Sequence, residues 1–415
     1  MSDLSTLAPD NRDLSMFPGE YGLPFLGKTI EFVKDTLAMC NKHYERFGPV
    51  SRLDMVKNQR VLMCLGPEFN EATLFDPKGN FSVAGGYASS LGGLYPDGML
   101  TRDDVKHKRT RRASQPAFKN DALKTYVDML IPIQERRIQD LPINEEFIFY
   151  DNIQQTLMDV AARVFIGLDE LSPEAKRLGY LFSEINEGLI TPLPYNLPFL
   201  QYRKSLKARE ELRKFFIDNI PKRRGSDGLD MFTRYCNAKD EDGQYLNDID
   251  IDGHIAFLLF AAFDTTTSAL TNILYYLGKN PDWQDKVRNE IFDVKNKMPT
   301  FDDLAEMKLT EYVFQETLRF YPSVMVLNRR TTRDVNVAGY DIPANTVVMI
   351  SPPFTHRMEQ WWDDPYTFDP MRFSPERAEH KRHGFSYVPF GGGAHKCIGM
   401  HFAMMNAKLY LFRLL

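Results

Sequence analysis

The stretch best suited to chemistry is FGGGAHKCIG, residues 390–399, which holds three consecutive glycines and the cysteine Cys397. An apolar sequence with helical periodicity follows the cysteine, so the positive end of that helix would stabilise a thiolate. Glycines lack a Cβ atom and would let the backbone pass close to a large flat ligand. Such a thiolate can bind the iron of a haem. A phosphate-binding loop fits less well because the Gly-Lys-Ser/Thr ending is absent, and a buried, inert cysteine is the remaining alternative.

A second candidate is the string ETLR, in which Glu316 and Arg319 lie three residues apart and share one helix face. Their neighbours in EYVFQETLRFYP are apolar, and a buried charge pair needs further partners to offset the loss of water. Arg372 in FDPMRF is the third member that we expect in a buried Glu–Arg–Arg network. Three other ExxR strings are expected to be solvated surface pairs: Glu174–Arg177, Glu210–Arg213 and Glu379–Arg382.

The string AAFDTTTS places Asp264 and Thr265 inside an otherwise apolar helix. A carboxylate and a hydroxyl beside small alanines can widen the helix groove and pass protons into an apolar pocket. The alternative is structural, since a threonine hydroxyl in a helix often bonds to the carbonyl group one turn earlier. The residues alone do not separate these two readings.

The basic string KHKRTRR, residues 106–112, carries five Lys or Arg side chains in seven positions. Most such strings are simply solvated. A functional interpretation divides them between anionic groups of a cofactor and an acidic protein partner. His107 and Arg111 are four residues apart, so both can reach one anion from the same helix face.

Composition narrows the class of protein. The chain has 415 residues, 43% hydrophobic residues and a formal net charge of -5, as expected for a globular protein that does not bind nucleic acid generally. Four well-separated cysteines indicate a reducing, cytoplasmic setting. The N-terminus has no signal-peptide pattern, and the longest central apolar run, IAFLLFAAF, is too short to span a bilayer. We therefore expect no membrane anchor.

Hydrophobic periodicity predicts a mainly α protein with a small β-rich portion, in one domain over residues 1–415. A helix is expected over residues 30–47, and a hairpin of VSRLDMV and QRVLMCLG around Lys57-Asn58. Residues 81–98 are expected to be a long functional loop. A long apolar helix should begin at Asp248 and end before Pro281.

Together these motifs resemble the cytochrome P-450 superfamily of haem-thiolate monooxygenases. FGGGAHKCIG is similar to its cysteine loop, ETLR to its K-helix pair, FDPMRF to its meander and AAFDT to its oxygen-activating helix. Order and spacing agree over nearly the whole chain. The resemblance implies the cytochrome P-450 fold, with haem b (iron protoporphyrin IX) as cofactor and O2 as co-substrate.

The resemblance also implies roles for single residues. Cys397 would be the iron ligand, and Asp264 and Thr265 would be the catalytic pair that supplies protons. Glu316, Arg319 and Arg372 would support the scaffold without taking part in the chemistry. The remaining cofactor-binding residues would be His107, Arg111, Arg329, Phe390, His395 and Gly399.

Several features depart from the usual family pattern. His107 replaces a tryptophan and His395 replaces an arginine, so haem binding should depend more on pH. His395 leans toward the sterol demethylase branch, whereas LPYNLPFLQYRKSLKAREEL and Asp264 lean toward the retinoid and carotenoid hydroxylases. Only 18 residues follow Cys397, so the C-terminal strands of the family are expected to be short or missing.

The expected function is hydroxylation of a lipophilic small molecule, such as a terpenoid, retinoid, sterol or fatty acid. Electrons would come from a ferredoxin or flavodoxin-type donor with its reductase, and the protein would be a monomer. The donor would dock at Lys106, Lys108, Arg109, Arg112, Lys396 and Lys408. Peroxygenase, isomerase and sensor functions of the same haem-thiolate family are the alternatives. The expected substrate pocket comprises Tyr87, Leu94, Phe257, Phe260, Ala261, Val324, Met325 and Val326.

Overall fold

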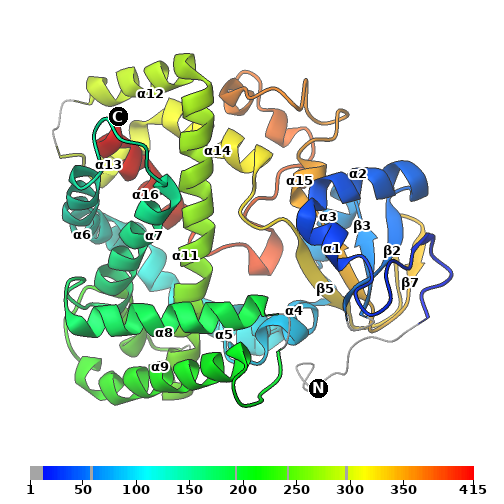
Figure 1. Ribbon diagram of the computed structural model, residues 1–415, viewed down its shortest axis with the longest axis horizontal. Coiled ribbons are helices and arrows are strands. Elements are labelled where there is room, and N and C mark those ends of the chain that lie inside the picture. The colour runs from blue at the N-terminus through cyan, green and yellow to red at the C-terminus, as the bar shows by residue number, and fades with distance from the viewer. Residues whose placement is uncertain (1–12, 57–58, 192–193, 241–242, 295–297) are drawn as a thin grey trace. The chain divides into compact units, whose positions relative to one another are not determined.

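The computed structural model describes residues 13–56, 59–191, 194–240, 243–294 and 298–415. The chain divides into two compact units, which are described separately (Figure 1). The first, here called the sheet unit, comprises Met1–Gly92, Leu100–Asp104 and Gln315–Cys397. The second, the helical unit, comprises Gly93–Met99, Val105–Phe314 and Ile398–Leu415.

Within the described part of the sheet unit, six strands form one mixed sheet in the order β1-β2-β3-β8-β5-β4, and β6 pairs with β7 in a separate hairpin. Strands β2 and β3 are antiparallel, which confirms the predicted pairing, while its Lys57-Asn58 turn lies outside the described residues. The strand bounds are β1 (Gly19–Glu20), β2 (Val50–Asp54), β3 (Arg60–Cys64), β4 (Phe81–Ser82), β5 (Leu327–Thr331), β6 (Val335–Val337), β7 (Tyr340–Ile342) and β8 (Val347–Ile350).

Alternation along β3 explains why this sheet is buried on both faces. Leu62 and Cys64 belong to one hydrophobic cluster, whereas Val61 and Met63 belong to another. Successive side chains of a strand point to opposite faces, so each face of β3 meets its own core. Phe69 of α3 (Pro67–Leu74) packs in the first cluster, and α2 (Thr36–Phe47) contributes to the second.

The remaining helices of the sheet unit correct two predictions. The helix expected over 30–47 is two helices, because Asp35 leaves helical geometry and its side chain accepts a hydrogen bond from Ala38 N as the cap of α2. The loop expected over 81–98 contains a helix, α4, which is capped by the Ser82 hydroxyl. The bounds are α1 (Thr29–Lys34), α4 (Val83–Leu91), α15 (Pro352–Thr355) and the 3-10 turns η6 (Pro370–Phe373), η7 (Glu379–Lys381) and η8 (Gly393–His395).

The helical unit surrounds α11 (Asp248–Lys279), the long apolar helix of 32 residues (Figure 1). It begins at the predicted residue, where the Asn247 side chain accepts from Asp250 N, and Pro281 starts the next helix. The other elements are η3 (Met99–Thr101), α5 (Asp104–Ser114), η4 (Gln115–Phe118), α6 (Asn120–Gln139), α7 (Phe149–Val160), the π-helix η5 (Ala161–Ile166), α8 (Pro173–Ile190), α9 (Gln201–Arg223), α10 (Met231–Cys236), α12 (Pro281–Asp293), α13 (Phe301–Glu306) and α16 (Met400–Leu414), while α14 (Lys308–Phe320) runs from this unit into the sheet unit.

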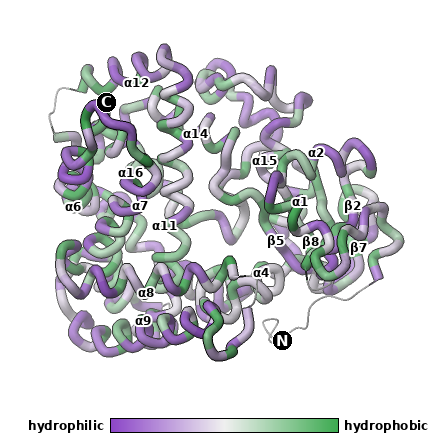
Figure 2. The backbone as a smooth tube through the Cα atoms, in the orientation of Figure 1, coloured by the Kyte–Doolittle hydropathy of each residue, from purple (hydrophilic) through white to green (hydrophobic). Residues whose placement is uncertain are grey.

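Hydropathy separates α11 from the helices that cover the unit. The tubes of α9 and α12 are largely hydrophilic in Figure 2, and each buries only a narrow row of side chains. Among the described residues, α11 is the one helix long and apolar enough to cross a membrane, but half of its most apolar stretch is buried inside the protein. A core helix has this property too, so its length and composition are weak support for a membrane span. The mainly α fold with a small sheet is confirmed.

Candidate functional site

The cysteine loop belongs to the sheet unit and is closed by its own backbone. Cys397 N donates to Phe390 O at 2.9 Å, and Gly391 N donates to Val388 O at 3.0 Å. The Cys397 side chain is exposed, unlike those of the other three cysteines, and α16 begins three residues later. Among the described residues, no three His, Cys, Asp or Glu side chains gather as a metal site, but a haem iron needs only one such protein ligand.

The three glycines of this loop serve different purposes. Gly393 has φ +60°, and a Cβ atom there would lie 1.9 Å from Leu74 O of α3. A Cβ atom on Gly392 would also meet Leu74, at 3.2 Å. The expectation that all three glycines make room for a flat ligand is therefore wrong for these two, which make room for α3. Gly391 has φ +67° and open space around it, so it alone meets the expectation.

His395 lies beside a carboxylate that the sequence did not single out. Its Nε2 atom is 3.9 Å from Asp103 Oδ1. The same carboxylate accepts from the Ser82 hydroxyl at 2.5 Å and from Val83 N at 3.0 Å, so it is fixed at the start of α4. A propionate bound by His395 would compete with Asp103 for the imidazole proton.

Arg329 provides a test of whether the sheet unit suits an anionic cofactor. Its side chain is 5% exposed, and burial lowers the pKa of the guanidinium. Among the described residues no carboxylate lies within ion-pair distance of it, and Nη1 donates to the carbonyl group of Asn328 at 2.8 Å. A buried cation without a carboxylate is costly, so an external anion such as a propionate fits this position.

The helical unit contributes His107 and Arg111 from α5. His107 is 2% exposed, and burial together with the charges of Arg111 and Lys108 lowers its pKa to about 4. Near neutral pH the imidazole is therefore uncharged and can act toward an anion only as a neutral hydrogen-bond donor. The expectation that haem binding depends more on pH therefore does not hold near neutral pH for His107. For His395 it stays a prediction.

The predicted catalytic pair, Asp264 and Thr265, lies on an unbroken stretch of α11. The Thr265 hydroxyl donates to Ala261 O at 2.6 Å, which is the structural alternative considered for this threonine. The α-helical pattern continues through both residues, so the predicted widening of the groove is absent. Asp264 reaches open space, yet the surrounding protein disfavours its charge and raises the pKa of the carboxyl group. A carboxyl group of this kind is suited to carrying a proton.

Half of the predicted substrate pocket lies in the helical unit. Leu94 is buried, and the ring of its neighbour Tyr95 stacks on Phe260 with 4.9 Å between centroids. Phe257 meets the edge of Tyr95 at 6.3 Å, and the Tyr95 hydroxyl bonds to Asn186 Oδ1 at 3.1 Å. The sequence missed Tyr95, although its place beside Leu94 was a signal. Ala261, the fourth predicted pocket residue in the helical unit, is half-buried.

The other predicted pocket residues lie in the sheet unit. Tyr87 of α4 accepts from Asn328 N at 3.4 Å, which directs its hydroxyl toward β5. Val324 is 38% exposed and Met325 is half-buried. Val326 packs against the hydrophobic cluster of α2 and β3, so it is part of the core, as the structural alternative held.

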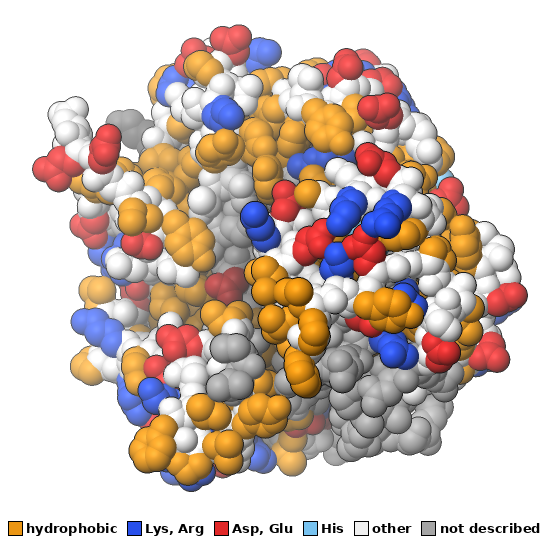
Figure 3. All heavy atoms as spheres, turned by 45° about the vertical axis from the view of Figure 1, so that its right-hand side comes forward, with side chains coloured by type: hydrophobic (Ala, Val, Ile, Leu, Met, Phe, Trp, Pro, Cys, Tyr) orange, Lys and Arg blue, Asp and Glu red, His pale blue; other side chains and the backbone are white. Residues whose placement is uncertain are grey.

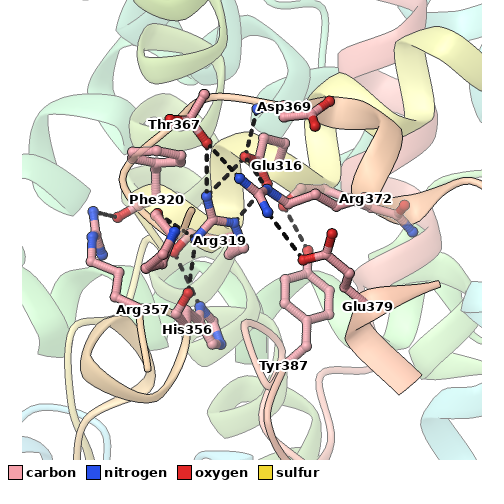
Figure 4. A network of polar contacts seen from close by, with 12 residues as sticks. Glu316, Arg319, Phe320, His356, Arg357, Thr367, Asp369, Arg372, Glu379 and Tyr387 are labelled. Carbon is pink, nitrogen blue, oxygen red and sulfur yellow. Dashed lines mark hydrogen bonds and ion pairs between the residues drawn. The ribbon is translucent and has the colours of Figure 1, made fainter. Parts of the chain in front are cut away.

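The predicted Glu–Arg–Arg network is present, fully buried and larger than expected (Figure 4). Arg319 binds Glu316 through Nε at 2.7 Å and Nη2 at 2.9 Å. Arg372 approaches the same carboxylate at 3.4 Å and a second one, Glu379, at 3.0 Å. Carbonyl groups of the meander accept the remaining donors: those of His356, Pro365 and Thr367 from Arg319, and those of Asp363, Asp364 and Thr367 from Arg372.

Glu379 corrects a sequence-based expectation. Its ExxR string was expected to be a solvated pair, but Glu379 is 0% exposed and binds Arg372 and Arg377. Arg382, the other end of the string, instead pairs with Asp363 on the surface. Tertiary contacts with Arg372, Arg377 and Asp363 therefore decide the partners of the two residues, and their spacing in the sequence does not.

His356 connects this network to the cysteine loop. Its Nδ1 atom lies 3.3 Å from Arg319 O and its Nε2 atom accepts from Val388 N at 2.9 Å. This arrangement requires the neutral ring protonated at Nδ1. Burial, with the charges of Arg319 and Arg357, lowers the pKa of His356 to about 3.

The predicted donor-docking surface is smaller than expected. Lys408 is 3% exposed and binds Glu311 at 2.9 Å and Leu304 O at 3.0 Å, so its assignment to a docking rim was wrong. Arg109 pairs with Asp240 at 2.5 Å. Lys106, Lys108 and Arg112 are exposed. The face in Figure 3 shows basic side chains beside acidic ones, without a field of a single sign.

Alanine substitutions separate the two left-handed glycines of the loop. We expect Gly393→Ala to destabilise the protein by more than about 3 kcal/mol, because the new Cβ atom would overlap Leu74 O. Gly391→Ala, with a similar φ but open space, should cost about 1–2 kcal/mol. Urea unfolding measures both, and equal losses would contradict the role assigned to α3.

Two arginines test the burial of the network. Arg372→Met leaves two buried carboxylates without their shared partner and should cost about 3–5 kcal/mol. The matched control Arg382→Met removes only an exposed pair and should cost less than about 1 kcal/mol. Thermal unfolding of the two variants gives the comparison. A loss at Arg382 as large as that at Arg372 would contradict the assignment.

The lowered pKa of His356 predicts an acid-dependent loss of stability. The unfolded chain binds a proton on this residue below pH 6.5, but the folded protein does not until about pH 3. The unfolding free energy should therefore fall as pH drops from about 6.5 toward 3, by up to ~1.4 kcal/mol per pH unit. His356→Gln should flatten this slope and the exposed control His401→Gln should not. Parallel slopes in all three proteins would refute the prediction.

Comparison with known proteins agrees with this geometry. The chain matches the family model Cytochrome P450 over residues 17–415. A putative cytochrome P450 136 of Mycobacterium tuberculosis is 32% identical over 98% of this chain and 83% of its own length. Taxane 10-beta-hydroxylase of Taxus cuspidata is 27% identical over 95% of this chain and 82% of its own length. The solved structure titled "Retinoic acid bound cyanobacterial CYP120A1" is 29% identical, with a TM-score of 0.85 over 96% of this chain and 91% of that chain. The chain therefore belongs to the cytochrome P450 family and is a monooxygenase that uses haem iron and dioxygen.

Proposed function

We propose that this monooxygenase hydroxylates a lipophilic small molecule of the terpenoid, retinoid, sterol or fatty acid type. The observation that carries the proposal is the apolar wall that Phe257 and Phe260 form with the buried Leu94, because these two rings lie on the same helix as Asp264 and Thr265. Two relatives support the substrate class, since one is named a taxane hydroxylase and one structure is titled as bound to retinoic acid. Both molecules are largely apolar.

Haem b is the proposed cofactor, with Cys397 as its iron ligand. The bound haem-thiolate supplies the activation of dioxygen. Arg329 offers a buried cation to a propionate, and His395 offers a hydrogen bond that Asp103 can partly divert. His107 and Arg111 are the proposed partners from the helical unit, with His107 acting as a neutral donor. Phe390 and Gly399 are the first and last residues of the loop that contains the cysteine.

Proton supply is assigned to the pair on α11. The raised pKa of Asp264 lets the carboxyl group take up and release a proton closer to neutral pH than an ordinary aspartate. Thr265 holds its hydroxyl proton against Ala261 O, so the hydroxyl must rotate away from this carbonyl before it can donate elsewhere.

Electrons are proposed to come from a separate ferredoxin or flavodoxin-type protein with its reductase. The exposed cations Lys106, Lys108 and Arg112 of α5 and Lys396 of the cysteine loop support docking of an acidic donor. A cytoplasmic, monomeric protein without a membrane anchor is part of the same proposal. The reducing setting is supported by buried, unpaired cysteines Cys40, Cys64 and Cys236.

Turnover with two oxidant systems tests this function. Fatty acids, terpenoids, retinoids and sterols are first screened by the haem spin-state change, and a hit is then oxidised with reduced ferredoxin or with peroxide. We expect ferredoxin-driven hydroxylation in the wild type and at least about tenfold poorer coupling in Thr265→Ala, because one proton-transfer group is lost. The control Thr271→Ala, whose hydroxyl also bonds one turn back, should behave as wild type.

Other outcomes would contradict the proposal. Turnover with peroxide alone would favour a peroxygenase, and rearrangement without oxidant an isomerase. Binding of gases without any turnover would favour a sensor. Unchanged coupling in Thr265→Ala would remove this residue from the proton path. The iron ligand is checked independently of substrate by the spectrum of the reduced protein with carbon monoxide. We expect the wild type to show the thiolate-type spectrum and Cys397→Ala to lose it.

A further inference from the structure

The segment Gly93–Met99 of the helical unit forms turns up to the start of η3, and Leu94, Tyr95 and Gly98 within it are buried. Leu94 and Tyr95 are each 1% exposed. Within the segment, Gly98 N donates to Tyr95 O at 3.3 Å. Contacts with other elements also hold the segment in place.

Arg209 of α9 provides the central contact. Its Nη1 and Nη2 atoms bind both oxygens of Asp252 on α11, at 3.0 and 2.7 Å. Its Nε atom donates to Leu94 O at 3.2 Å. The two side chains are 11% and 3% exposed. One planar guanidinium thus joins α9, α11 and the segment, which the three donors of a lysine could not do with the same geometry.

Close packing adds to this contact. A Cβ atom on Gly98 would lie 2.7 Å from the Phe257 ring, and one on Gly253 would lie 2.5 Å from Asp97. The Tyr95 hydroxyl bonds to Asn186 of α8 at 3.1 Å. The segment is therefore held by α8, α9 and α11 together.

We propose that Arg209 and Asp252 are a positioning pair that fixes the segment Gly93–Met99 against α8, α9 and α11. The pair holds Leu94 and Tyr95 against Phe260 and thereby sets which lipophilic molecules the wall accepts. The consequence for specificity rests on the proposed function, whereas the positioning itself does not.

The physical reason is the cost of leaving either charge alone. The pair is nearly buried, so its opening leaves a carboxylate and a guanidinium poorly solvated. Arg213 lies 3.9 Å from the same carboxylate but is 44% exposed, and among the described residues it forms no hydrogen bond with the segment. It binds the carboxylate less closely than Arg209 does, and it is a matched control on the same helix.

Hydrogen exchange of the haem-loaded protein tests the positioning. Arg209→Met keeps an aliphatic side chain of similar length and removes the guanidinium group. The amides around Tyr95 and Gly98 should exchange at least about tenfold faster in this variant, because the segment opens more often. The control Arg213→Met should change their exchange less than about twofold. Equal protection in Arg209→Met and wild type overturns the proposal.

A double variant keeps the test decisive if Arg209→Met does not fold. Arg209→Met with Asp252→Leu removes both charges, so no buried carboxylate is left unpaired. This variant should fold and bind haem, as its carbon monoxide spectrum reports, and should still exchange rapidly in the segment. Protection equal to that of wild type overturns the proposal here too.

Ligand titration tests the consequence for specificity. Dissociation constants for a slender fatty acid and a bulky terpenoid are measured from the spin-state change of the haem. In Arg209→Met the affinity for the bulky ligand relative to the slender one should rise at least about fivefold, since a loosened wall admits it. Arg213→Met should keep the wild-type ratio. An unchanged ratio with faster exchange overturns the specificity claim alone. If neither ligand perturbs the wild type, the proposed function fails, and exchange still decides the positioning.

Discussion

The buried charges around Arg319 are the constraint on which the cysteine loop depends. Two arginines and two glutamates are removed from water together, so their donors and acceptors must be met inside the protein. The meander supplies backbone carbonyl groups at the correct places, which fixes its irregular path. His356 contacts Arg319 O and accepts a hydrogen bond from Val388 N. The carbonyl group of Val388 in turn accepts from Gly391 N at the start of the loop. The cysteine is thus placed by a chain of hydrogen bonds that begins at a buried ion pair.

The helical unit uses charge in a different way. Its long central helix is apolar over most of its length, and the exceptions have separate roles. Asp252 is paired and nearly buried, and it ties neighbouring segments together. Among the described residues no Lys or Arg forms an ion pair with Asp264. Its pKa is raised, so the carboxyl group can exchange a proton. The same residue type is an ion-pair partner at one place and has a raised pKa at another because of its surroundings.

Sequence reasoning succeeded where one local pattern is strong. The bounds of α11 followed from its apolar composition and from Pro281, and Glu316 with Arg319 followed from charges inside an apolar helix. It failed where distant segments meet. Glu379 looked like a surface residue because its neighbours are polar, and Lys408 looked like part of a basic rim because lysines are usually exposed. Asp103 gave no signal, since its partner His395 is almost 300 positions away in the sequence.

The sequence by itself determined the family and the mainly α class, and it predicts Cys397 as the residue that would bind iron. Motif spacing carries these features, because a thiolate, an acid beside an alcohol and a buried charge pair each require particular residue types. Only the tertiary structure decided which glycines face α3, which arginine binds two carboxylates and which lysine is buried. These outcomes depend on segments that pack together from distant positions, where burial sets the energetic cost of every unpaired polar group.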